Sequence, residues 1–197
     1  MAVDFTNDII LENERVLLRP LRVSDFIHLI GFSVEEPDLW NFSLQTAAGP
    51  ENLKKYLEFA DEGRVHLREY PFIVFDKKLN EYAGSTRYYD VQKEYKTLQL
   101  GYTWYGKKFQ GTGLNKQCKF LLLEFAFEKW DMERVEFRAD NENARSIAAM
   151  KSIGCTVDGV LRNNVPKPQG GRRDSIVLSI LRNEWFSEVK AKLKGKL

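Results

Sequence analysis

The chain has 197 residues, of which 43% are hydrophobic and 13% are aromatic. This composition excludes a disordered chain and predicts one domain, residues 1–197, with a sizeable core. The net charge of +2 argues against DNA or an anionic membrane as a partner, because both call for strongly basic surfaces. Cys118 and Cys155 are far apart and lack metal-site spacing, so we expect two buried free thiols and no metal.

The N-terminal sequence does not have the features of a secretory signal. It has no basic segment followed by an apolar one, and no apolar run anywhere reaches the roughly 20 residues that a bilayer span needs. These features predict a cytoplasmic protein with no membrane partner.

The first quarter of the chain predicts one strand and two helices. Residues 15–21 form an apolar run typical of a strand. Ser24 or Asp25 can cap a short helix that follows it. Residues 49–63 have apolar side chains at helical spacing and predict a longer helix.

The rest of the chain alternates strands and helices. The expected elements are two strands in 71–91, a strand at 96–105, a helix at 114–130, a strand at 132–140, a helix at 141–154, two strands in 155–181, and a helix with a solvated basic tail at 183–197. This order predicts an α/β (α+β) domain with a mixed, mostly antiparallel sheet of about six or seven strands and helices on both faces.

A glycine-rich loop, KKFQGTGLNKQ at residues 107–117, joins a predicted strand to a predicted helix. The N-terminus of a helix offers unpaired N–H groups and favours phosphate, and Gly111 and Gly113 let the backbone approach an anion closely. Thr112 stands where a P-loop needs lysine, and Lys116 stands where the dinucleotide fingerprint needs its third glycine. The loop alone is therefore either an ordinary helix start or a site for another phosphate-bearing ligand.

Together with a second motif, this loop resembles the acetyl-CoA loop of GNAT-superfamily N-acetyltransferases, and most closely the Rim-type branch. The family loop follows the pattern Gln/Arg-x-x-Gly-x-Gly/Ala, and this chain has KFQGTG at residues 108–113. The second family element is Asn-x-x-Ser before a helix that ends in Lys-x-x-Gly, and this chain has NARS at 143–146 and MKSIG at 150–154. The resemblance covers roughly residues 13–182.

The resemblance implies an acetyl-CoA-dependent N-acetyltransferase that acts on a primary amine, either a protein N-terminus or a small molecule. It implies central strands that splay where coenzyme A binds, with Asn143 on the pantetheine arm and Ser146 near the thioester sulfur as proton donor. The residues expected to hold coenzyme A are Tyr102, Thr103, Trp104, Tyr105, Lys108, Gln110, Gly111, Thr112, Gly113, Leu114, Asn115, Asn143, Arg145, Ser146 and Lys151.

The general base is the point where the chain departs from the family pattern. Several members carry a glutamate on the strand before the loop, whereas Gln99 holds that place here and an amide cannot act as a base. Glu35, Glu36 and Asp38 are other candidates for this catalytic role, and release of the proton to bulk solvent is a further possibility. We expect Glu35, Glu36, Trp40 and Tyr88 to form the acceptor site.

Two other functions stay open at this stage. A non-catalytic module that binds CoA or acyl-CoA would keep the loop and could lack the base. A nucleotide-binding regulator is a weaker alternative, because the loop fails both nucleotide spacings. The sequence does not identify the amine acceptor, and it leaves the oligomeric state open, with a homodimer as one candidate.

Overall fold

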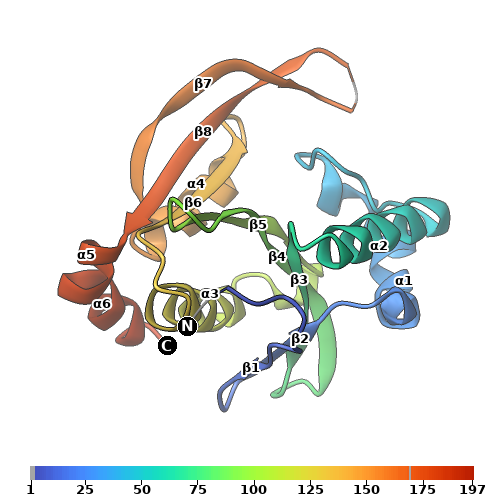
Figure 1. Ribbon diagram of the computed structural model, residues 1–197. Helices are drawn as coiled ribbons and strands as arrows, with labels where there is room; N and C mark the ends of the chain where they lie inside the picture. The colour runs from blue at the N-terminus through green and yellow to red at the C-terminus, as the bar shows by residue number, and fades with distance from the viewer. Residues whose placement is uncertain (1–2, 169) are drawn as a thin grey trace.

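The computed structural model describes residues 3–168 and 170–197, which form an eight-stranded sheet in the order β1-β2-β3-β4-β5-β6-β8-β7 (Figure 1). The strands are β1 (Leu11–Glu12), β2 (Val16–Pro20), β3 (Tyr70–Asp76), β4 (Glu81–Gln92), β5 (Thr97–Tyr105), β6 (Arg134–Asp140), β7 (Thr156–Pro166) and β8 (Arg172–Leu181). Only β5 and β6 pair in parallel among the described strands. The expected mixed sheet is confirmed, with one strand more than expected because the two-residue β1 pairs with β2.

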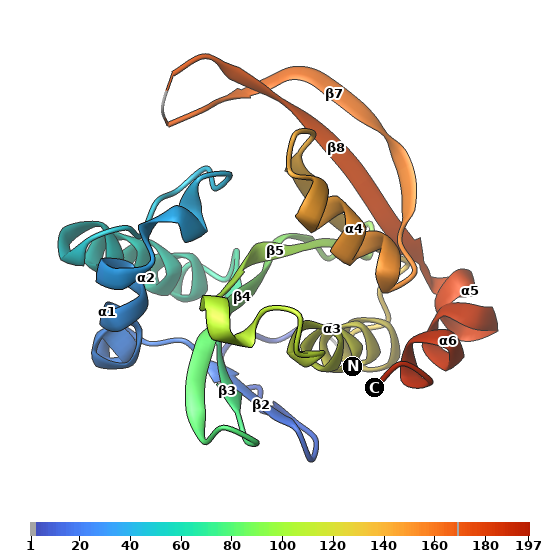
Figure 2. The same cartoon turned by 180° about the vertical axis from the view of Figure 1, so that it is seen from behind.

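Helices cover both faces of the sheet (Figures 1 and 2). They are α1 (Phe26–Glu35), α2 (Pro50–Val65), α3 (Leu114–Glu124), α4 (Ala144–Ser152), α5 (Arg182–Glu184) and α6 (Lys190–Lys194), and π-helical turns extend α3 over Phe125–Lys129 and join α5 to α6 over Trp185–Val189. The apolar stripe of α2 packs on one face of the sheet with Ile73 and Trp104. The other core cluster joins α3, α4 and the C-terminal helices to the opposite face.

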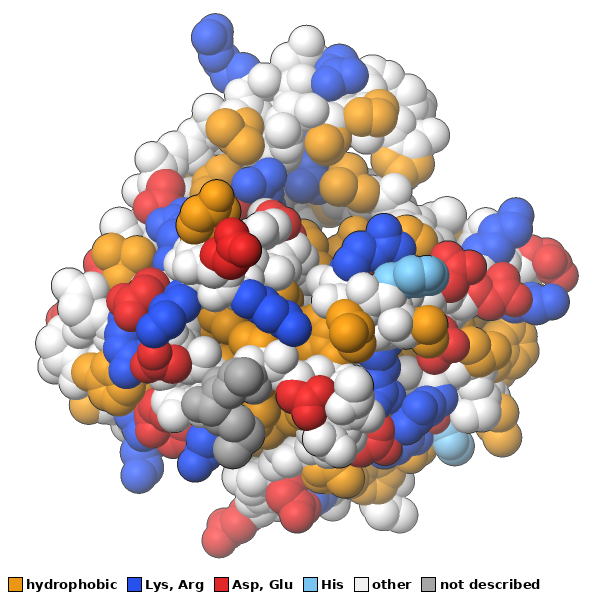
Figure 3. All heavy atoms as spheres, in the orientation of Figure 1, with side chains coloured by type: hydrophobic (Ala, Val, Ile, Leu, Met, Phe, Trp, Pro, Cys, Tyr) orange, Lys and Arg blue, Asp and Glu red, His pale blue; other side chains and the backbone are white. Residues whose placement is uncertain are grey.

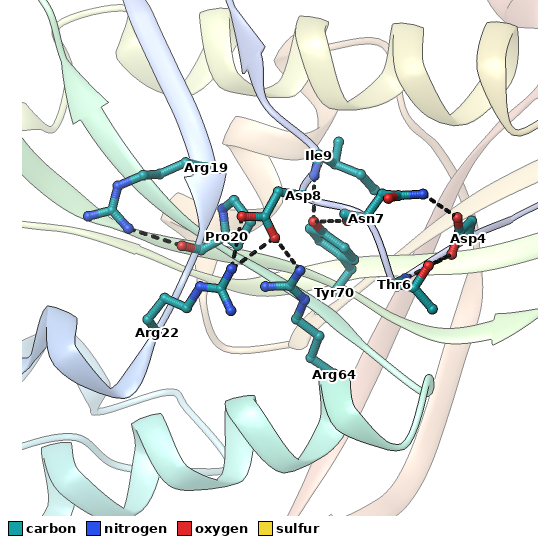
Figure 4. A network of polar contacts seen from close by, with 10 residues as sticks. All are labelled: Asp4, Thr6, Asn7, Asp8, Ile9, Arg19, Pro20, Arg22, Arg64 and Tyr70. Carbon is teal, nitrogen blue, oxygen red and sulfur yellow. Dashed lines mark hydrogen bonds and ion pairs between the residues drawn. The ribbon is translucent and has the colours of Figure 1, made fainter.

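Polar contacts tie the N-terminal segment to α2, to the segment after β2 and to the start of β3 (Figure 4). The Asp8 carboxylate accepts hydrogen bonds from Arg64 at 2.6 Å and Arg22 at 2.8 Å, and these guanidinium groups lower the pKa of Asp8. The hydroxyl of Tyr70 accepts a hydrogen bond from the backbone N–H of Ile9 at 2.6 Å. The first residues of the described chain therefore form part of the fold.

Two local expectations need correction. Asp25 does start α1, but its side chain does not cap it: the carboxylate instead pairs with Arg19 and accepts from the backbone N–H of Arg22. The C-terminal segment is packed, and not a solvated tail, since Leu193 is buried and Lys190 pairs with Glu128 of the α3 extension.

The helices of the described residues include none that is both long and apolar enough to span a bilayer.

Candidate active site

The candidate site is a cavity of about 540 Å³ at the place where β5 and β6 separate. The two strands pair only from Thr97–Gln99 to Arg134–Glu136, yet β5 continues to Tyr105 and β6 to Asp140. The parts of β5 and β6 that do not pair with each other line the cavity. The glycine loop, α3, α4, β8 and the segment around η2 (Pro37–Trp40) form the rest of its wall. The expected splay of the central strands is thus present.

A bulge in β5 shapes one wall of the cavity. The register between β4 and β5 shifts between Ser85, which pairs with Trp104, and Arg87, which pairs with Gly101. Tyr102 lies in the extra segment with a φ of 48°, a conformation that costs a non-glycine residue free energy. Because β-bulges bend the strand and re-aim its side chains, this bulge turns the end of β5 away from β6.

The glycine loop presents unpaired backbone amides at the start of α3. Gly111 and Gly113 have φ values of 74° and 87°, and a Cβ atom at either position would meet no atom within 4 Å. Among the described residues, no acceptor receives the N–H of Gly111, Thr112, Gly113 or Asn115. Amides left free in this way beside a helix N-terminus are typical of an anion site.

Side chains on both sides hold this loop in place. The amide nitrogen of Gln110 donates to the carbonyl of Tyr105 at 2.8 Å, and its oxygen accepts from Arg145 of α4 at 2.6 Å. The hydroxyl of Thr112 donates to the carbonyl of Phe109, whose ring is buried in the core. The loop therefore connects β5, α3 and α4 across the mouth of the cavity.

The first turn of α4 forms the opposite wall. Asn143 is the N-cap of this helix, and its side-chain oxygen accepts from the backbone N–H of Ser146 at 3.0 Å. Both residues line the cavity, and the hydroxyl of Ser146 has no partner among the described residues. The NARS motif thus serves the helix cap and the cavity wall at once.

Most residues expected at the coenzyme site do line one cavity. The members of the expected coenzyme set that line it are Tyr102, Thr103, Trp104, Tyr105, Gln110, Gly111, Gly113, Asn115, Asn143, Arg145 and Ser146. Trp40, expected at the acceptor site, lines the same cavity.

Four residues expected at the coenzyme site lie outside the cavity wall. Lys108 forms an ion pair with Glu81. Lys151 is exposed on α4 and does not line the cavity. Leu114 is fully buried beneath the loop, and Thr112 lies on its outer side. For Leu114 and Thr112, only the backbone N–H could contact a ligand in the cavity.

Four of the expected base and acceptor residues do not line the cavity. Gln99 is buried and its amide donates to Asp90, outside the cavity. Tyr88 points into the core, where its hydroxyl donates to the carbonyl of Leu122. The Glu36 carboxylate accepts from the backbone N–H of Lys107 at 2.7 Å, and Glu35 is exposed outside the cavity.

Sequence reasoning missed Lys119, which lies buried on α3 and lines the cavity. Its Nζ donates to the hydroxyl of Thr103 at 2.7 Å and to that of Thr86 at 3.1 Å. Burial lowers the pKa of Lys119 to about 8, since no carboxylate of the described residues pairs with it. The sequence does contain a signal for this residue, because Lys119 falls among the apolar residues of the buried face of its helix.

The charged side chains of the cavity wall are mostly cations. Lys116, Lys119, Arg138, Arg145 and Arg173 line it, against one acid among the described residues, Asp38. Such a field, with the loop amides, attracts an anionic ligand.

Comparison with known proteins agrees with this geometry. A family model described as an acetyltransferase (GNAT) domain matches residues 15–156. Because that is well over half of the chain, the chain belongs to the GNAT acetyltransferase family, and its fold is that of an acetyltransferase.

Individual relatives include proteins named as ribosomal acetyltransferases. The chain is 24% identical over 185 residues to YdaF of Bacillus subtilis (strain 168), a candidate ribosomal N-acetyltransferase, covering 89% of this chain and 96% of that one. A candidate acetyltransferase from T. thermophilus is 33% identical with a TM-score of 0.85, covering 95% and 96% of the two chains. The ribosomal-protein-S5-alanine acetyltransferase of Vibrio fischeri shares the fold, with a TM-score of 0.73 and 20% identity over 90% and 99%.

Proposed function

We propose that this protein is an acetyl-CoA-dependent N-acetyltransferase that moves an acetyl group to a primary amine by direct attack on the thioester. The observation that carries the proposal is the cavity between the separated halves of β5 and β6, which runs from the unpaired loop amides to Ser146. The names of the relatives are consistent with a protein N-terminus as the acceptor, and a small amine is the other candidate.

The residues present fit coenzyme A. Its pyrophosphate would accept hydrogen bonds from the amides of Gly111 to Gly113, with Arg145 and Lys116 nearby on the cavity wall. The open space beside both glycines leaves room for the phosphates. The amide-rich pantetheine arm would pair with the free edge of β5, as an added strand pairs with a sheet.

The chemistry then needs few groups from the protein. The neutral amine nitrogen bonds to the carbonyl carbon and loses a proton as the carbon–sulfur bond breaks. The thiolate of CoA takes up a proton that we assign to the hydroxyl of Ser146, and the proton lost by the nitrogen returns through water to the Ser146 oxygen. Cavity-facing backbone N–H groups of β5 would polarise the carbonyl. Gln99 does not reach the cavity, so the proton of the incoming ammonium leaves through water, with Asp38 the acid of the described cavity wall that could receive it. Holding the amine and the thioester in line supplies much of the rate enhancement.

The proposal is tested by CoA release and by the mass of the product. The protein is mixed with acetyl-CoA and a panel of amino acids, polyamines and N-terminal peptides, and each amine is checked for acetylation. We expect Ser146→Ala to lower kcat by about 10²-fold with little change in acetyl-CoA affinity, because it removes proton transfer only. The control is Ser187→Ala, an exposed serine on the terminal π-helical turn.

Binding of acetyl-CoA with no CoA release for any amine would instead indicate a non-catalytic CoA-binding module.

A further inference from the structure

One end of the cavity holds a buried arginine with no acidic partner among the described residues. Arg173 lies on β8, is 7% exposed and lines the cavity. Its Nε donates to the hydroxyl of Ser175 at 3.0 Å, and its Nη1 is 3.4 Å from the carbonyl oxygen of Phe42, which follows η2. Within the described residues no carboxylate oxygen lies within 4 Å of it.

This lack of a partner sets Arg173 apart from the other buried arginines. Arg64 pairs with Asp8 at 2.6 Å, and Arg87 pairs with Glu69 at 2.5 Å. A buried charge is costly unless it is paired, and burial lowers the pKa of Arg173 accordingly. Arg64 and Arg87 have acidic partners within the protein. Arg173 has none among the described residues, so it is suited to pair with an anionic group of a bound ligand.

Two acids of β6, the strand that pairs with β8, are engaged elsewhere. Asp140 raises the pKa of Arg173 from a distance, but its own ion pair is with Lys167 at 3.3 Å. Glu136 accepts from Arg138 at 2.6 Å and from Arg134 at 3.0 Å. None of these side chains can neutralise Arg173 without giving up a contact that it already makes.

The walls around Arg173 are aromatic and face the same cavity. Tyr89 and Tyr102 meet edge to face with their ring centroids 5.1 Å apart, and Trp40 lines the cavity with its indole N–H buried and without a partner among the described residues. Figure 3 shows a recess between the arm formed by β7 and β8 and the region of α2, with basic and hydrophobic side chains at its edge. A guanidinium among aromatic walls is suited to a carboxylate, which its planar fork can hold through two hydrogen bonds.

We infer that the acceptor is a primary amine that also carries a carboxylate, and that Arg173 binds this carboxylate while the amine points toward the thioester. The inference rests on the proposed acetyl transfer and narrows its substrate class. A polyamine or aminoglycoside would place further cations beside Arg173 and Arg138, where the described wall offers Asp38 as its one acid. Arg145, bonded to the glycine loop through Gln110, remains available to the coenzyme phosphates at the other end.

The test compares carboxylates with their amides on protein saturated with desacetyl-CoA, so that binding does not depend on turnover. The probes are glycine, β-alanine, γ-aminobutyrate, δ-aminovalerate, phenylalanine and alanyl-glutamate, each titrated calorimetrically beside its carboxamide. Because the first four probes differ in chain length, the one that binds most tightly gives the distance between amine and carboxylate that the site prefers. We expect at least one carboxylate to bind about tenfold or more tightly than its amide, the usual scale for a charged hydrogen-bonded pair.

Variants then assign the preference to Arg173. Arg173→Gln should abolish the difference between carboxylate and amide, and Arg173→Lys should retain part of it. Desacetyl-CoA affinity and thermal stability, measured on the same samples, should stay near those of the wild type. Arg162→Gln, an exposed arginine on β7, is the matched control and should keep the full preference.

Equal binding of carboxylates and amides, or a preference that survives in Arg173→Gln, would overturn the inference. So would a loss of desacetyl-CoA affinity in Arg173→Gln, because Arg173 would then serve the coenzyme. Failure of the proposed function itself looks different: no amine of either kind would release CoA from acetyl-CoA.

Discussion

At the scale of single residues, the buried cations of the cavity determine its chemistry. Lys119 and Arg173 both line the cavity and lack an acidic partner among the described residues, but their surroundings differ. Lys119 is held by the hydroxyls of Thr86 and Thr103, which also lie 2.8 Å from each other. These neutral partners orient the amine without restoring the lost hydration of its charge, so burial lowers the pKa of Lys119 to about 8.

The pKa of Lys119 makes a prediction about stability and pH. In the unfolded chain this amine has its ordinary pKa, so below pH 8 both states are protonated and the folded state bears the full cost of burying the charge. The cost declines as pH rises from about 8 toward the ordinary lysine value. We expect Lys119→Met to raise the free energy of unfolding at pH 7 by up to about 3 kcal/mol, and by much less at pH 10.

Urea unfolding of the wild type and the variant at both pH values checks this prediction. Lys129→Met, an exposed lysine on the π-helical extension of α3, should show no such pH-dependent difference. If Lys119→Met is destabilised equally at pH 7 and pH 10, then its hydrogen bonds to the threonines outweigh the burial of its charge.

At the scale of elements, the start of α4 combines a structural and a proposed binding role in Asn143. Its side-chain oxygen caps the helix through the N–H of Ser146, which leaves the NH₂ group free for the pantetheine arm. Asn143→Ala should lower the free energy of unfolding by about 1 kcal/mol, the usual cost of losing a cap, and should weaken acetyl-CoA binding. Asn143→Asp keeps a cap but loses the NH₂ donor, so we expect wild-type stability with weaker acetyl-CoA binding.

Denaturant unfolding and the KM for acetyl-CoA separate the two roles. Wild-type KM in Asn143→Asp would show that the residue acts through the helix cap alone.

Most elements could be predicted from the sequence because their apolar periodicity coincides with burial. Residues 49–63 were expected as a helix with an apolar face, and α2 buries Leu53, Tyr56, Leu57 and Ala60. The short β1 was not predicted, because two residues are too few to show an apolar alternation. Its strand conformation comes from pairing with β2. The bulge at Tyr102 escaped for a similar reason, since it arises from the register of β4 against β5.

The candidate site could be predicted only where motifs fix the backbone. The glycine loop and NARS motif indicated residues that do line one cavity, because positive φ angles and helix caps are encoded locally. The acceptor side could not be predicted in this way, because alternation in a strand does not say which face meets the core: Tyr88 faces the core, whereas its neighbour Tyr89 lines the cavity. Arg173 lies 131 residues beyond Phe42 in the sequence, so their contact depends on the complete fold.

At the scale of the whole molecule, one sheet provides both halves of the proposed site. The antiparallel strands up to β5 carry the glycine loop at their end, and β6 and β8 carry α4 and Arg173. The short parallel pairing of β5 with β6 holds these halves together at one end and lets them separate at the other. The central claim is therefore that the opening between them, with the glycine loop at its mouth, binds acetyl-CoA.

Calorimetric titration of acetyl-CoA into the wild type, Gly111→Asp and Gly159→Asp tests this claim most directly. Aspartate tolerates the positive φ at position 111, so the fold should persist while a carboxylate fills the space proposed for the pyrophosphate. Gly159 also has open space at its Cβ but lies on β7, away from the cavity wall. We expect micromolar binding by the wild type and Gly159→Asp, and at least tenfold weaker binding by Gly111→Asp. Equal binding by all three proteins, or none by the wild type, would contradict the account.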